Sequence, residues 1–167
     1  MKKLAAAAVA AAGIVLAAAA PAQAVTVRPS QAPLLSASGE DSTCVLTTKG
    51  STYVVNGIRR LKHKGEVVCQ TAWLRQKVEV SAFVVQDGQR VPLYTGGSAR
   101  GVGSSTTWAF SSVGPVCQAD AWGLSWDPQP GVTYQVVLAT RATVKDTPNN
   151  SGEPWTARTE KLVEVTC

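Results

Sequence analysis

The sequence predicts an all-β fold, an antiparallel β-sandwich of about seven strands with two disulfides. Three observations support this prediction. Short segments alternate between apolar and polar residues, as strands do when one face is buried. Turn-forming Gly, Pro, Asn and Asp residues separate these segments at short intervals. Four cysteines follow an N-terminal leader, and no segment has the apolar stripe of an amphipathic helix.

Residues 1–24 have the three-part layout of a secretory signal peptide. Two lysines give a basic start, an apolar run extends from Leu4 to Ala20, and Ala24 ends an Ala-x-Ala cleavage site. The run is short and mostly alanine, whereas a membrane span needs about 20 strongly apolar residues. We therefore expect cleavage after Ala24, a secreted, extracellular protein and no membrane span after cleavage. A retained anchor is the less favoured alternative.

The size and charge of the remaining chain restrict its class. The 143 residues that follow Ala24 fit one domain with a hydrophobic core of its own. Loss of the two leader lysines leaves 14 basic against 11 acidic residues, a net charge of +3. This charge is too small to indicate nucleic acid as a partner. The expected partner is an unknown extracellular protein or polysaccharide.

The cysteines are expected to form two disulfides instead of a metal site, because no Cys-x-x-Cys pair is present and the chain has one histidine. Three connectivities are possible. Cys69 lies in an expected strand whose neighbour begins near Cys44. Cys167 ends the last strand, which should return beside the strand that opens just after Cys117. The strand order therefore favours Cys44–Cys69 and Cys117–Cys167.

The domain is expected to begin after a disordered stretch. Residues 25–43 are rich in Pro, Ser and Ala and have no sustained period, so we expect a disordered N-terminal segment there and the β-domain over residues 44–167.

Two strands are expected over residues 67–74 and 77–85, both with clear alternation. Asp87-Gly88 then predicts a two-residue hairpin, because a type I′ turn needs positive φ at both positions. The returning strand, residues 90–94, contains Pro92, which cannot donate to a ladder and predicts an edge position.

The remaining elements follow from composition and alternation. In chain order they are a Gly- and Ser-rich loop over residues 96–105, a short strand over 106–111, an irregular segment over 113–131, the most regular strand over 132–144, a turn region over 145–154 and a closing strand over 157–167.

The stretch Pro130-Gly131-Val132-Thr133-Tyr134 resembles the start of the sixth strand in fibronectin type III domains. In that family the tyrosine hydroxyl pins the corner between strands five and six. Trp73 is similar to the second-strand tryptophan that packs the core there. The resemblance implies an Ig-like or fibronectin III-like sandwich. Val136 stands where an antibody-type domain would have a cysteine, which argues against that subfamily.

Leader and domain together also resemble small secreted proteins of Gram-positive actinobacteria, a resemblance that implies export but no activity.

Two sets of residues are candidates for a functional role. His63 lies in Arg59-Arg60-Leu61-Lys62-His63-Lys64-Gly65, where the flanking lysines and the glycine predict a solvated turn; catalysis, or contact of this basic cluster with an anionic cell-wall polymer, is less favoured. Trp122, Trp126 and Trp155 fall in irregular or turn segments, where exposed rings could stack on sugars. The favoured alternative is that these rings cover the end of the sandwich and pack on the Cys117–Cys167 bridge.

The sequence contains no phosphate loop, dinucleotide fingerprint or paired carboxylates suited to catalysis. We therefore expect no enzyme activity, no metal and no cofactor. The hypothesis is a secreted, non-enzymatic extracellular binding or structural module. Its alternatives are a carbohydrate-binding module that uses the three loop tryptophans and a secreted protease inhibitor that presents residues 111–119 around Cys117.

Overall fold

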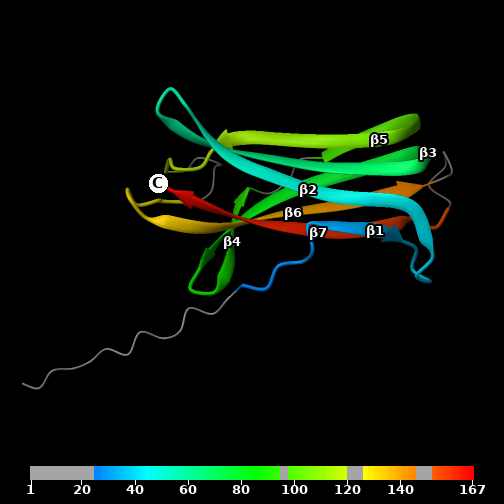
Figure 1. Ribbon diagram of the computed structural model, residues 1–167, viewed down its shortest axis with the longest axis horizontal. Coiled ribbons are helices and arrows are strands. Elements are labelled where there is room, and N and C mark those ends of the chain that lie inside the picture. Colours follow the sequence, from blue (N-terminus) through cyan, green and yellow to red (C-terminus); the bar gives the residue numbers. More distant parts are fainter. Residues whose placement is uncertain (1–24, 95–97, 120–125, 146–151) are drawn as a thin grey trace, which may run out of the picture.

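The computed structural model describes residues 25–94, 98–119, 126–145 and 152–167 (Figure 1). All regular structure in these residues is β-strand, and they contain no helix long and apolar enough to cross a membrane. The strands are β1 (Gln31–Leu35), β2 (Asp41–Val55), β3 (Ile58–Gln86), β4 (Gln89–Tyr94), β5 (Ser98–Pro115), β6 (Thr133–Lys145) and β7 (Trp155–Thr166).

These elements form one antiparallel sheet in the order β2-β1-β7-β6-β3-β4, with β5 beside β3. Because β2 pairs with both β1 and β3, the sheet curls into a half-barrel. This single sheet differs from the predicted pair of facing sheets. The seven strands become eight when the two parts of the long β3 are counted separately, against the about seven expected.

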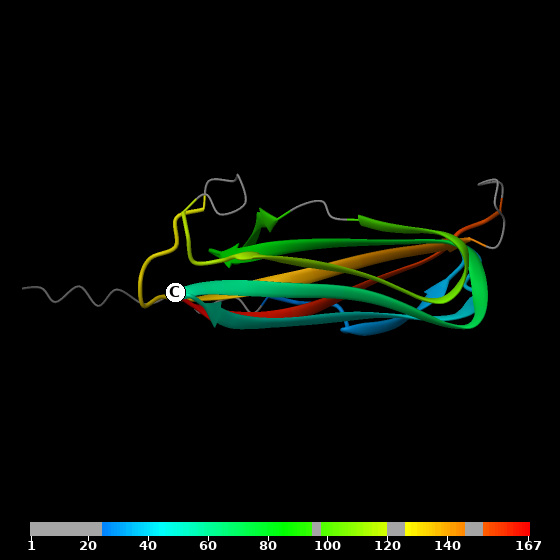
Figure 2. The same cartoon turned by 90° about the horizontal axis from the view of Figure 1, so that it is seen from above.

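The long strand β3 shapes the half-barrel. Its first part, residues 58–69, pairs with β2 on one side and with the end of β5 on the other. Its second part, residues 75–86, pairs with β6 on one side and with β4 and the start of β5 on the other. The register shifts between Val68 and Arg75, and Figure 2 shows β3 bending from one layer into the other. One strand thus belongs to both walls.

The interior contains two apolar clusters, each next to one disulfide. The first cluster surrounds Cys44 and Cys69, and the second packs against Cys117 and Cys167. Both predicted pairings are confirmed, with Cα atoms 4.0 Å apart in the first bridge and 5.2 Å in the second. Cys44 and Cys69 are direct cross-strand partners on β2 and β3.

A polar layer lies between the two clusters. It consists of Thr48, His63, Thr140 and Thr159, none more than 2% exposed. The Thr48 hydroxyl donates to Thr140 Oγ1 over 2.8 Å, and since this uses its only proton, the Thr159 hydroxyl donates to Thr48 Oγ1 over 2.6 Å. His63 Nε2 lies 3.1 Å from Thr140 Oγ1. These hydrogen bonds join β2, β3, β6 and β7 across the interior.

Side chains of the interior pack directly against two glycines, Gly50 and Gly65. A Cβ atom on Gly65 would collide with Thr140 Cγ2 and lie 2.8 Å from Val78 Cγ1, and one on Gly50 would collide with Leu138. Both glycines lie on inward-facing positions of β2 and β3. A larger residue at either position would force the facing side chains of Leu138, or of Thr140 and Val78, to shift.

The prediction of a disordered N-terminal segment is wrong for residues 41–43, where β2 begins, and for residues 31–35. This segment forms β1, between β2 and β7, although it contains Pro33. The physical reason is burial: Leu34 is fully buried in the first apolar cluster. The preceding residues are fixed as well, because Glu160 N–H donates to the Pro29 carbonyl and Thr48 N–H to the Ser30 carbonyl.

The loop predicted over residues 96–105 is also wrong from Ser98 onward. There the backbone of β5 pairs with the second part of β3, so small residues that are typical of loops form part of a hydrogen-bonded ladder.

Other predictions about turns and strands are confirmed. Asp87 and Gly88 both have positive φ and join β3 to β4, the terminal strand of the sheet order. The two regular C-terminal strands are β6 and β7.

The turn before β6 is held by Tyr134. Its hydroxyl accepts a hydrogen bond of 2.8 Å from Gln129 N–H, five residues upstream. The Tyr134 ring also meets Trp126 edge-to-face, with centroids 4.9 Å apart.

Replacement of Gly65 by alanine should destabilise the fold. We expect Gly65→Ala to lower the free energy of unfolding by about 1–3 kcal/mol, because the new methyl group overpacks the interior against Thr140 and Val78. Urea denaturation followed by tryptophan fluorescence measures this change.

The matched rescue is Gly65→Ala with Thr140→Ser, since serine lacks Cγ2 but keeps the hydroxyl. We expect the double variant to recover part of the lost free energy of unfolding, so that the effects of the two substitutions are not additive. The exposed Ser111→Ala serves as control. An unchanged urea midpoint for Gly65→Ala would show that the walls are not in close contact at this glycine.

Candidate functional site

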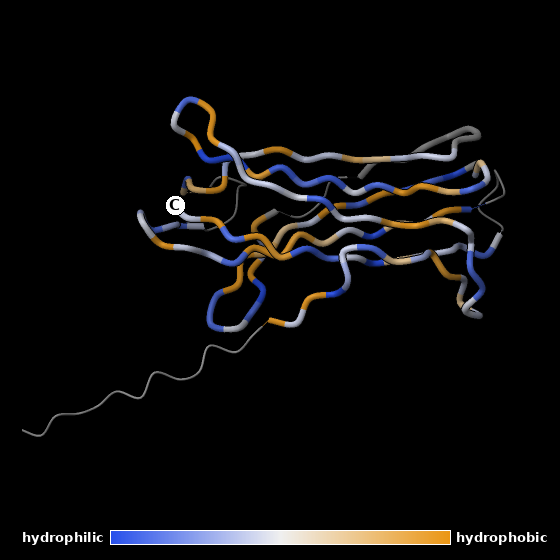
Figure 3. The backbone as a smooth tube through the Cα atoms, in the orientation of Figure 1, coloured by the Kyte–Doolittle hydropathy of each residue, from blue (hydrophilic) through white to orange (hydrophobic). Residues whose placement is uncertain are grey.

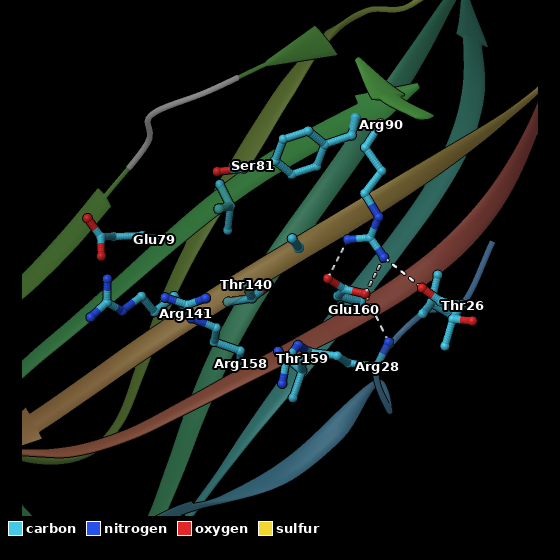
Figure 4. A pocket seen from close by; sticks show the side chains of 14 residues that line it. Thr26, Arg28, Glu79, Ser81, Arg90, Thr140, Arg141, Arg158, Thr159 and Glu160 are labelled. Carbon is cyan, nitrogen blue, oxygen red and sulfur yellow. Dashed lines mark hydrogen bonds and ion pairs between the residues drawn. The ribbon is translucent and has the colours of Figure 1, made fainter. Parts of the chain in front are cut away.

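A groove of about 820 Å³ crosses the outer face of β3, β6 and β7. Alternate side chains of these strands enter the interior, so the residues between them point outward. Residues 26–28 and Arg90 border the groove at one end (Figure 4). We call this hollow the outer groove; its charged residues are Arg28, Glu79, Arg90, Arg141, Arg158 and Glu160.

At one end of the outer groove, the carboxylate of Glu160 is paired with the guanidinium group of Arg90. Arg90 binds it in a bidentate manner, with Nη1 donating to Oε1 over 2.7 Å and Nη2 to Oε2 over 2.9 Å. The Arg28 main-chain N–H donates to Oε2 over 2.9 Å, and Arg90 Nη2 also donates to the Thr26 carbonyl. Hydrogen bonding from Arg90, more than any other contact, lowers the pKa of Glu160, and the same bond raises the pKa of Arg90. These contacts also fasten the N-terminal segment to β7.

Arg141 and Arg158 are a like-charged pair in the middle of the groove. They are direct cross-strand partners on β6 and β7, an arrangement that destabilises an antiparallel sheet. Glu79 is the partner of Arg141 on β3, but the salt bridge of Glu79 is with Lys77, over 2.5 Å. Within the part of the chain that the structure describes, neither arginine forms a salt bridge or a side-chain hydrogen bond. Figure 4 shows the two side chains together, away from Arg90.

A second, smaller hollow continues the basic surface. Its volume is about 210 Å³, it shares Glu79 and Arg141 with the outer groove, and it adds Arg75, Lys77 and Lys145. Positive side chains therefore outnumber the two carboxylates along the combined surface. Guanidinium groups bind carboxylates and phosphates through paired hydrogen bonds. The arrangement is thus suited to an extended anionic ligand. Among the described residues, no group of three His, Cys, Asp or Glu could hold a metal ion.

The three loop tryptophans do not share one surface. Trp126 is 4% exposed and its Nε1 donates to the Val116 carbonyl over 2.7 Å, so it offers no ring face to a sugar. Trp155 is half-buried at the other end of the sheet and meets Trp73 edge-to-face, with centroids 4.9 Å apart. Trp122 lies outside the described residues.

The prediction of a solvated turn at His63 is wrong. This residue lies within β3, points into the half-barrel and is 2% exposed. Its Nδ1 has no hydrogen-bond partner among the described residues. Burial lowers the pKa of His63 to about 4, so the ring is neutral at neutral pH. Alternation along β3 explains the error, because it places His63 inside and the flanking Lys62 and Lys64 outside.

Sequence reasoning missed the outer groove. Alternation in residues 132–144 does place Arg141 on the polar face of its strand, which is a usable signal. Its pairing with Arg158 depends on the register of β6 against β7, and the border of the groove depends on an N-terminal segment that was expected to be disordered.

Comparison with known proteins gives no match: no protein family fits the sequence, and no curated protein or solved structure is significantly similar to the chain.

Acid should destabilise the protein through His63. The folded state lowers the pKa from 6.5 to about 4, so the unfolded chain binds more protons between these values. The contribution of His63 is therefore complete above about pH 6.5 and is lost as the pH falls toward about 4, for a total of about 3 kcal/mol. Urea denaturation at a series of pH values measures this dependence.

His63 is the only histidine, so its NMR titration needs no assignment. We expect a folded-state pKa near 4. Replacement by glutamine, which keeps a polar side chain near Thr140, should flatten the stability profile between about pH 5.5 and 7, where the carboxylates of the unfolded chain are already ionised. An ordinary titration near pH 6.5 in the folded protein would mean that the ring is solvated.

Proposed function

We propose that the protein is a secreted, non-enzymatic binding module that holds an anionic extracellular polymer, a polysaccharide with carboxylate or phosphate groups, in the outer groove. The observation that carries this proposal is the cross-strand pair Arg141 and Arg158, neither of which forms a salt bridge with a described residue. A bound anion between the two guanidinium groups would remove their mutual repulsion. The pair is thus better explained by ligand binding than by folding.

The location of the carboxylates supports this assignment. Glu160 is the only acidic residue beside Arg158 in the groove, and Arg90 and Arg28 N–H already satisfy it. The Lys77 ammonium forms a single, more exposed salt bridge with Glu79. Both internal anions are therefore engaged elsewhere, and an anion from outside has no strong competitor. The extension toward Arg75 and Lys145 favours a chain over a single small anion.

The two disulfides are compatible with an extracellular protein. Secretion after cleavage at Ala24 is part of the proposal, as is membership of the Ig-like or fibronectin III-like domains. The Tyr134 contact with Gln129 supports that membership, and the curled single sheet does not add to it.

The two alternative functions gain no such support. A sugar-stacking surface would need exposed aromatic rings, and Trp126 is buried. An inhibitory loop would need an exposed, protruding segment around Cys117. Residues 111–115 belong to β5 instead, and Val116 is fully buried, with its N–H bonded to the Arg59 carbonyl.

The test is retention on immobilised polyanions. Polygalacturonate supplies carboxylates, polyphosphate supplies phosphates, and dextran supplies neither. We expect the protein to bind at least one of the two polyanions, to ignore dextran and to elute with salt. Arg141→Gln with Arg158→Gln should weaken binding about tenfold or more, since each arginine gives up a charge-assisted hydrogen bond.

The matched control is Arg59→Gln with Lys62→Gln, which removes the same charge from residues outside the groove. This variant should keep its affinity for the polyanions. Equal losses in both double variants would indicate binding through net charge alone and would contradict the proposed site.

A further inference from the structure

The hairpin that joins β2 to β3 ends in an apolar tip. Tyr53, Val54 and Val55 are consecutive, and they are 37%, 54% and 41% exposed. Asn56 and Gly57, both with positive φ, form the turn. Figure 1 shows the hairpin projecting beyond the body at the end that holds the C-terminus, and Figure 3 shows its apolar colour on both arms. We call residues 53–58 the hairpin tip.

The tip does not serve the core. Neither apolar cluster includes Tyr53, Val54 or Val55. Because side chains alternate along a strand, three consecutive apolar residues place apolar groups on both faces of the hairpin. Exposed runs of this kind are rare unless they have a function, since they promote aggregation. A tip that packed on a flat partner would need only one apolar face, whereas a tip surrounded by an apolar medium needs two.

Positive charges follow the tip on both faces. Arg59 is the cross-strand partner of Val54, Arg60 is the partner of Tyr53, and Lys62 follows two residues later. Within the described chain none of these three cations forms a salt bridge. The sequence has no Asp or Glu from Ser42 to Gly65.

The nearest carboxylate in the sequence does not cancel this charge. Glu66 lies at the far end of the hairpin and is bound by Lys49 and Lys64, at 2.8 and 2.7 Å. Hydrogen bonding from these lysines lowers the pKa of Glu66. The positive charge of Arg59, Arg60 and Lys62 therefore remains available for an external anionic surface.

We propose that the hairpin tip inserts into the interface of a lipid bilayer that carries anionic headgroups. Tyrosine and aliphatic side chains lie readily at the boundary between headgroups and acyl chains, and nearby Lys and Arg bind anionic headgroups. Three side chains expose far less area than the roughly 800 Å² per partner that a stable protein interface buries. Shallow insertion therefore fits the size of the tip, its two apolar faces and its cations together.

The two binding surfaces are separate. The outer groove contains no residue of the hairpin tip, and the tip lies between β2 and the first part of β3. The protein can thus attach to a membrane through the tip while the groove stays open.

The test is co-sedimentation of the full chain with vesicles of phosphatidylcholine mixed with phosphatidylglycerol, and with vesicles of phosphatidylcholine alone. We expect binding to the mixed vesicles and little binding to the neutral ones. Val54→Ser with Val55→Ser should weaken binding about tenfold or more. Leu35→Ser is the matched control, because Leu35 is 40% exposed on β1 and should not contribute.

The charge contribution is tested with Arg59→Gln and Lys62→Gln together, which should weaken binding about fivefold per charge. Arg141→Gln with Arg158→Gln removes the same charge from the outer groove and should leave vesicle binding unchanged. Because all these positions are exposed or partly exposed, thermal unfolding should show that every variant remains folded.

Several results would overturn the proposal. Equal binding to both kinds of vesicle, or to neither, would exclude recognition of an anionic bilayer. Unchanged binding after loss of both valines would exclude the tip, and a loss confined to the Arg141 and Arg158 variant would place lipid binding in the groove. Self-association in sedimentation equilibrium that the valine variant abolishes would assign the tip to contact between copies of the chain.

Discussion

The fold depends on the close approach of two walls that share one strand. β3 pairs with β2 through its first part and with β6 through its second, so the two walls can separate only if the bend in β3 opens or these ladders are lost. The walls meet where Gly65 faces Thr140 and Gly50 faces Leu138. The hydrogen-bonded layer of Thr48, Thr140, Thr159 and His63 lies at the same level. A cavity there would leave these polar groups dry and unpaired, which costs more than the bonds contribute when they are made.

This narrow interior directs function to the outside. Inward-facing positions of β3, β6 and β7 are occupied by the two apolar clusters and the polar layer. Side chains at the outward-facing positions do not have to fill the interior. Two of them, Arg141 and Arg158, are like-charged cross-strand partners, which is unfavourable for the sheet. The N-terminal segment and Arg90 then border this face, so that Glu160, which would otherwise neutralise Arg158, is already bound.

The local features of the fold could be predicted, and the long-range ones only in part. Alternation and turn chemistry are local, which is why β6, β7 and the Asp87-Gly88 hairpin were predicted correctly. Asn56-Gly57 is an equally strong hairpin signal, and it would have placed His63 in a returning strand instead of a turn. β1 and the groove depend on register between distant strands, which one sequence does not contain. The first disulfide was predictable because Cys44 and Cys69 lie on neighbouring strands, and the second because Cys167 returns beside Val132, at the start of β6, a short distance after Cys117.

The chemistry of the outer groove also restricts what its ligand can be. Arginine keeps its charge at every pH at which the protein folds, and Arg90 holds the pKa of Glu160 below its usual range. The charge of the Arg90–Glu160 pair is therefore constant near neutral pH. A change in binding between about pH 6 and 8 would then reflect titration of the ligand itself, which a phosphate monoester with a second pKa near 6 shows and a carboxylate does not. The fixed charge of the protein thus makes the pH dependence of binding a means of distinguishing the two kinds of anion.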